Sequence, residues 1–187
     1  MYATQCLTNQ FLVAMPGLVD PNFARTVTYI CEHNADGAMG IIVNRPINFH
    51  LGEMLDQLEI MVTNFAARKL PIYLGGPVQP DRGFVLHTGE SIWNSTLRIT
   101  PQINITTSKD ILEAIACGDG PPQILIALGY AGWAKGQIEN ELSTNTWLST
   151  PSTSEILFRL PVEQRWRAAG RLIGIDLDLV SLESGHA

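Results

Sequence analysis

Hydrophobic positions recur along the chain at two spacings, which separate candidate strands from candidate helices. Short runs rich in β-branched and aromatic residues, bounded by Pro, Gly, Asn or Asp, are typical of strands. The turn sequence Asn34-Ala-Asp-Gly37 predicts a hairpin, because Asp and Gly tolerate left-handed backbone angles. The strand-like runs occupy residues 11–16, 26–34, 39–44, 72–78, 83–87, 95–100, 103–107 and 123–129.

Other segments carry the apolar stripe of an amphipathic helix, with apolar residues three and four positions apart. Ser108 is a plausible N-cap for one of them, and Gly118 a plausible stop. Strands and helices rarely alternate one for one, so we expect an α+β fold with a mixed, mostly antiparallel sheet rather than a doubly wound α/β fold. The helix-like segments occupy residues 51–60, 109–117, 133–142, 154–160 and 162–174.

Length and composition fit one compact domain over residues 1–187. Apolar residues make up 45% of the chain and charged residues 16%, so a real core can form. No apolar run is long enough to span a bilayer, and no basic segment precedes the short apolar patch near the start, so we expect a cytoplasmic protein without membrane contact. Three widely spaced cysteines, Cys6, Cys31 and Cys117, indicate free thiols in a reducing compartment.

The net charge of the chain indicates whether nucleic-acid binding is expected. The net charge is −6, whereas a nucleic-acid binder normally carries a basic face. A local basic patch could still contact DNA through Arg165, Arg167 and Arg171 if its two helices formed a helix-turn-helix. Pro161 stands where such a turn usually has glycine, so a solvated helix face is the favoured interpretation and direct DNA binding a weaker alternative.

Cys31 and His33 are the candidates for catalysis, as nucleophile and base of a small hydrolase or transferase. Residues two apart on a strand face the same side but lie about 7 Å apart, too far for a direct hydrogen bond without bending. A core cysteine beside a turn histidine is therefore the favoured interpretation. No motif has the spacing of a zinc or calcium site, and we expect neither a metal nor a cofactor.

The segment Leu128-Gly-Tyr-Ala-Gly-Trp133 reads as a strand, a glycine turn and the start of a helix. A helix N-terminus can hold an anion, so Gly129, Gly132 and Trp133 are candidate binding residues. The alternative is that both glycines only permit a sharp turn and that the tryptophan belongs to the core.

Two more loops supply candidate binding residues. Asn44 and Arg45 precede Pro46 at a predicted strand end, where a polar pair can face a cleft. Arg82 follows a glycine kink and could hold a carboxylate or phosphate, although a surface ion pair is more common. The complete predicted binding site is Asn44, Arg45, Gly75, Gly76, Arg82, Gly129, Gly132 and Trp133.

Several long segments in order resemble the AlgH/YqgE family of bacterial proteins almost end to end, among them "FLVAMPGLVDPNFARTVTYICEHN", "GAMGIIVNRP", "YLGGPVQPDRGFVLH" and "LGYAGWAKGQIENEL". The resemblance implies a bifurcated sheet curled into a pseudo-barrel with surrounding helices, in a soluble cytoplasmic protein. The family has no established activity, and some members carry the label of transcriptional regulator. We therefore expect a non-enzymatic regulatory protein that binds a small anion or a protein partner.

Overall fold

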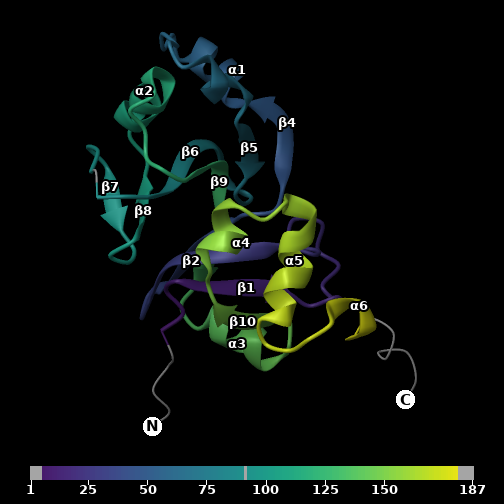
Figure 1. Ribbon diagram of the computed structural model, residues 1–187. Coiled ribbons are helices and arrows are strands. Elements are labelled where there is room, and N and C mark those ends of the chain that lie inside the picture. Colours follow the sequence, from purple (N-terminus) through teal and green to yellow (C-terminus); the bar gives the residue numbers. More distant parts are fainter. Residues whose placement is uncertain (1–5, 91, 181–187) are drawn as a thin grey trace.

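A branched sheet forms the framework of the protein in the computed structural model, which describes residues 6–90 and 92–180 (Figure 1). The main path of the sheet runs β10-β1-β2-β3-β9-β6-β8-β7, and β4 and β5 lie off this path. The strands are β1 (Gln10–Ala14), β2 (Val27–Asn34), β3 (Gly37–Ile42), β4 (Pro46–His50), β5 (Pro71–Leu74), β6 (Val78–Thr88), β7 (Thr96–Arg98), β8 (Ile103–Thr106), β9 (Ile124–Ala134) and β10 (Trp147–Pro151).

The sheet forks at β9. The first part of β9 pairs with β6 on one edge and in parallel with β5 on the other, whereas its last four residues pair with β3. The other strand pairs are antiparallel. A shared core joins both branches, since Tyr29 of β2, Phe84 of β6 and Ile105 of β8 belong to one apolar cluster. The predicted α+β fold, with a mostly antiparallel, bifurcated and curled sheet, is confirmed.

Helices cover the two branches separately (Figure 1). α1 and α2 lie on the branch of β4 to β8, and α3 to α6 lie around β1, β2 and β10. α2 has the predicted bounds, and Gly118 ends it with a left-handed φ of 90°. The helices are α1 (Leu51–Gln57), the 3-10 helix η1 (Phe65–Lys69), α2 (Lys109–Cys117), α3 (Gln137–Ser143), α4 (Ser154–Phe158), α5 (Val162–Arg171) and α6 (Leu177–Val180).

The prediction for residues 123–142 is wrong in its middle. The turn lies at residues 135–136 and not at the predicted residues 129–132, because β9 continues to Ala134 and α3 begins only at Gln137. Gly129 has a φ of 74°, and the strand passes from its partners β5 and β6 to its partner β3 around this residue. The glycine therefore redirects the strand instead of ending it.

Two strands were not predicted. Pro46 opens β4 rather than ending the sheet, and β4 has the alternating exposure of a strand covered on one face. β10 pairs with β1 along its whole length and forms the end of the main path. Both segments are short and polar in part, so their strand conformation depends on the partner strand more than on local propensity.

Candidate functional site

A cleft of about 670 Å³ lies at the fork of the sheet. One wall is the tip of the β2–β3 hairpin, the other is the β7–β8 hairpin, and β6 and β9 contribute residues between them. The volume is in the range of ligand sites in proteins. Its lining residues are Glu32, Asn34, Asp36, Gly37, Ala38, Met39, Arg82, Phe84, Ser95, Leu97, Ile105, Thr107, Tyr130, Gly132 and Trp133.

Arg82 is the cation of the cleft. Between the pairs Val78–Tyr130 and Gly83–Leu128 the register of β6 shifts, and the intervening bulge carries Arg82. The guanidinium carbon lies 5.2 Å from the centre of the Phe84 ring, and Nη1 donates to Gln79 Oε1 at 3.2 Å. Gln79 itself has a left-handed φ of 47°. The bulge thus places an exposed guanidinium over an aromatic ring, with donors left for a ligand.

The hairpin wall is acidic. Glu32 Oε1 accepts a hydrogen bond from Asn34 Nδ2 at 3.0 Å, and the Asp36 backbone N–H donates to Asn34 Oδ1 at 2.8 Å. Asn34 therefore holds the turn while the Glu32 and Asp36 side chains border the cleft. The lining holds two carboxylates and one guanidinium, so the electrostatics favour a basic or mixed-charge ligand over a small anion.

Three of the predicted binding residues, Arg82, Gly132 and Trp133, meet in this cleft. Gly132 is exposed, and the nearest atom to a Cβ added there is Tyr130 Cε2 at 3.5 Å. Trp133 is 6% exposed, and its Nε1 donates to Glu141 Oε2 at 2.9 Å. Trp147 Nε1 donates to the same carboxylate oxygen at 2.8 Å. Trp133 therefore packs mainly in the core, although it is among the lining residues of the cleft.

The remaining glycines of the predicted site form a backbone crossing. A Cβ on Gly75 would lie 2.3 Å from Gly129 O, and a Cβ on Gly76 would lie 2.1 Å from the Tyr130 carbonyl carbon. A Cβ on Gly129 would lie 2.4 Å from Gly76 O. These three glycines let the β5–β6 connection pass close to β9, and none of them lines the cleft. The predicted anion site at a helix N-terminus is absent here, because residues 129–133 are strand.

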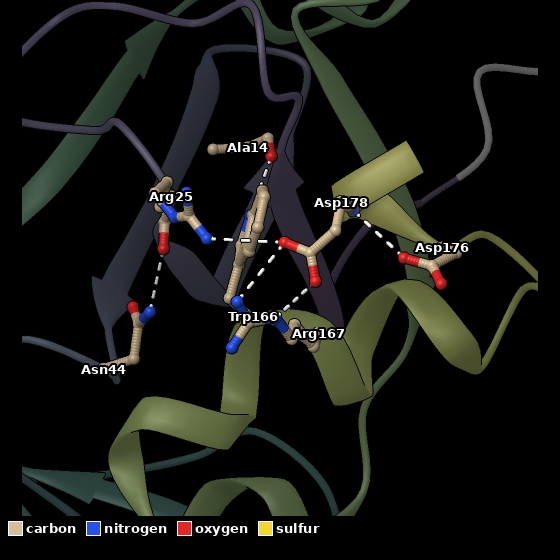
Figure 2. A network of polar contacts seen from close by, with 7 residues as sticks. All are labelled: Ala14, Arg25, Asn44, Trp166, Arg167, Asp176 and Asp178. Atoms are coloured by element: carbon tan, nitrogen blue, oxygen red, sulfur yellow. Dashed lines mark hydrogen bonds and ion pairs between the residues drawn. The ribbon is translucent and has the colours of Figure 1, made fainter. Parts of the chain in front are cut away.

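Asn44 and Arg45 lie away from the cleft and hold the loop before β2. Asn44 Oδ1 accepts from the Val27 N–H at 2.8 Å, and Asn44 Nδ2 donates to the Arg25 carbonyl at 2.9 Å. Figure 2 shows Asn44 beside Arg25. The Arg45 guanidinium donates to the backbone carbonyls of Pro21 and Ala24. Among the residues that the structure describes, neither side chain borders the cleft with Arg82.

The arginines proposed for DNA contact are largely engaged within the protein. Arg165 is 5% exposed and donates to the carbonyls of Val43 and Leu160. Arg167 Nε donates to Asp178 Oδ2 at 2.6 Å, as Figure 2 shows, and this bond lowers the pKa of the Asp178 carboxyl. Arg171 is exposed. The basic patch therefore offers fewer free cations than its sequence indicates.

Cys31 and His33 do not form the nucleophile–base pair considered above. The register between β2 and β3 shifts between Ile30 and Glu32, so the alternation of faces is broken between the two residues. Cys31 is buried in the apolar cluster, and desolvation raises the pKa of its thiol. His33 instead faces α3: Nδ1 accepts from the Leu7 N–H at 3.0 Å, and Nε2 lies 2.9 Å from Glu139 Oε1.

Cys6 is the thiol that sequence reasoning passed over. It is exposed, and a side-chain and a backbone hydrogen bond from Thr8 lower its pKa. Its Sγ lies 3.8 Å from the His33 carbonyl oxygen. No catalytic motif in the sequence marks it, and its contact with His33 comes from β2, far along the chain. Within residues 6–90 and 92–180, no three His, Cys, Asp or Glu side chains gather as a metal site would require.

No helix in the described part of the chain is long and apolar enough to cross a membrane. The family profile described as AlgH-like (DUF179) matches residues 11–178. A UPF0301 protein of Thioalkalivibrio sulfidiphilus is 52% identical over 187 residues, which cover 100% of both chains. One from Nitrosococcus oceani is 55% identical over 185 residues, covering 98% of this chain and 99% of the relative.

Solved structures agree with these matches. The solution structure of AlgH from Pseudomonas aeruginosa superposes with a TM-score of 0.81 at 48% identity, covering 100% of this chain and 99% of that one. A crystal structure of a protein from Corynebacterium diphtheriae shares the fold with a TM-score of 0.74 at 19% identity, over 97% of this chain and 94% of that one. This chain belongs to the AlgH-like family.

Proposed function

We propose that this protein is a non-enzymatic regulatory protein of the cytoplasm that binds a protein partner in the cleft at the fork of the sheet. The observation that carries the proposal is the cleft itself, which combines the exposed Arg82 guanidinium with the acidic hairpin tip. Any effect on transcription would then be indirect, through the partner.

The lining favours a protein partner over a small anion. Glu32 and Asp36 outnumber the one arginine, which disfavours a free phosphate or carboxylate. Leu97 on the opposite wall is 48% exposed and adds apolar surface. A mixture of charged and apolar groups on opposing walls is typical of a protein–protein contact.

The Cys31 thiol and the His33 imidazole support a role without catalysis. Cys31 is buried with a raised pKa, and His33 already uses both ring nitrogens in contacts with Leu7 and Glu139. A hydrolase would need a thiolate within hydrogen-bond reach of a base, and these two side chains face different clusters.

Selection of displayed random peptides against the immobilised protein tests the proposal. We expect peptides whose affinity, measured by fluorescence anisotropy, falls by about tenfold or more with Arg82→Ala and with Asp36→Lys. Arg159→Ala is the matched control, since Arg159 is exposed and lies outside the cleft. Failure to select any peptide, or equal affinity for the wild type and both cleft variants, would contradict the proposal.

A further inference from the structure

A second cavity, of about 540 Å³, lies between the sheet and the two helices α1 and α2. Apolar side chains from both layers line it, and the volume could hold a large side chain of a partner with room to spare. The apolar lining residues are Phe49, Met54, Leu58, Phe84, Val85, Leu112, Ile126 and Leu128.

The second cavity adjoins the cleft where β6 and β8 separate. Their pairing ends at Val85 and Thr106, and the next residues, Phe84 and Thr107, line both cavities. Beyond this point β6 enters its bulge, and two consecutive bulge residues diverge: Asp81 borders the apolar cavity and Arg82 borders the cleft. The two cavities are therefore compartments of one surface that meet at the split between the strands.

Two glycines along this surface leave the backbone without a side chain over it. A Cβ added to Gly83, which lines the apolar cavity, would meet no atom within 4 Å, and Gly132 in the cleft is exposed. Glycine inside a strand often marks the close approach of another backbone. In the described residues β6 pairs with β9 no further than Tyr130, so no strand covers that edge of β9 from Ala131 to Ala134. An extended chain could add to it.

The linings of both compartments together hold three carboxylates and two cations, Arg82 and Lys109. Glu32 and Asp36 border the cleft, and Asp81 borders the apolar cavity. Among residues 6–90 and 92–180, no donor contacts the Asp81 carboxylate. The nearby Lys109 is already engaged, because its Nζ donates to the Leu58 carbonyl at 3.2 Å and lies 4.0 Å from Glu113 Oε1.

We infer that the occupant is an extended segment of a partner protein with two anchors. A large apolar side chain, such as Leu, Met or Phe, fills the cavity under α1 and α2, and a Lys or Arg side chain faces Glu32 and Asp36. The backbone between them passes the bare glycines at the split in the sheet. This inference rests on the proposed function and adds the chemistry of the partner.

Variants of the apolar cavity test this inference with the peptides selected above. We expect a consensus with one large apolar and one basic position, and a loss of affinity of about tenfold or more with Leu58→Lys and with Asp81→Lys. Met61→Lys is the matched control, because Met61 is 85% exposed and does not line the cavity. Melting curves of Leu58→Lys and Asp81→Lys test whether each variant remains folded. Because Asp81 is exposed, Asp81→Lys tests the role of the cavity independently of Leu58→Lys.

Two outcomes would overturn the two-anchor inference. Peptides that depend on Arg82 and Asp36 but ignore Leu58→Lys and Asp81→Lys would leave the proposed function standing with the cleft as its complete site. Decylamine serves as a small amphipathic probe. If decylamine binds the wild type but not Leu58→Lys, and the peptide consensus has no apolar position, the occupant is a small amphipathic ligand instead. Peptides whose affinity does not fall with Arg82→Ala would contradict the proposed function itself.

Discussion

Arg45 and Arg165, in one branch of the molecule, have a different role from Arg82 in the other. In the closed half, built on β1, β2, β3 and β10 with α3 to α6, Arg45 and Arg165 donate to backbone carbonyls of neighbouring segments. In the same half Arg25 stacks on Trp166 at 4.5 Å and lies 3.6 Å from Asp178 (Figure 2). In the open half, built on β4 to β8 with α1 and α2, Arg82 borders a cleft.

This difference separates arginines that hold the fold from arginines that can hold a ligand. Backbone carbonyls at loops and strand ends need donors, and a guanidinium can satisfy two of them at once. Arg45 and Arg82 look alike in the sequence, since each stands beside a proline or glycine turn. Only the contacts distinguish the two arginines, and substitutions at each position test the distinction.

The largest effect is expected where the two halves meet. Gly129→Ala should lower the free energy of unfolding by about 2–4 kcal/mol, because alanine disfavours a φ of 74° and its Cβ would lie 2.4 Å from Gly76 O. Gly132→Ala, three residues later on the same strand, should change it by less than about 1 kcal/mol. Urea unfolding of both variants measures the difference, and equal losses would refute the crossing of backbones at Gly129.

The two arginines come next. Arg45→Ala should lower the free energy of unfolding by about 1–3 kcal/mol, because the carbonyls of Pro21 and Ala24 lose a charged donor. Arg82→Ala should cost no more than about 0.5 kcal/mol, since Arg82 is exposed and, within the described part of the chain, hydrogen-bonds only to the Gln79 side chain. Thermal melts of the pair distinguish them, and the opposite order would break the distinction between closed and open halves.

The open half should respond to acid through His87. Desolvation lowers the pKa of this buried imidazole below its ordinary value of 6.5, and Nε2 lies 2.8 Å from Thr106 Oγ1. Below that pH the unfolded chain binds a proton that the folded protein resists, so stability falls as the solution is acidified. His87→Gln should show a smaller fall in melting temperature between about pH 7.5 and 5.5. The same fall in both proteins would assign the acid sensitivity to other groups.

Thiol labelling tests the accessibility of the three cysteines without a substitution that changes stability. A maleimide should react first with Cys6, because the protein exposes it and hydrogen bonds from Thr8 lower its pKa, and then with the exposed Cys117. Cys31 should react only after unfolding, since burial raises its pKa. Mass spectrometry of the labelled peptides in native and denaturing buffer gives the order. Rapid native labelling of Cys31 would restore it as a candidate nucleophile.

The local hydrophobic pattern predicted most of the secondary structure. It was wrong where contacts with segments far along the chain determine the conformation. The stripe and caps of α2 are contained in residues 108–118, so its bounds follow from the sequence. The course of β9 depends on Gly75 and Gly76, which pack against it from far along the chain. The directions of the Cys31 and His33 side chains likewise depend on a bulge, which arises from the register of β2 with β3. Neither bulge nor crossing has a local signature.

The fold class and most of the elements follow from the sequence alone, because hydrophobic period and turn residues act over a few neighbours. The family followed from long segments that resemble AlgH/YqgE proteins. Which of the predicted site residues share a cleft depends on the tertiary structure. It brought Arg82, Gly132 and Trp133 together and assigned Asn44 and Arg45 to a loop. The physical reason is that a side chain's free donors are what remain after distant backbone groups have been satisfied, and those distances arise only on folding.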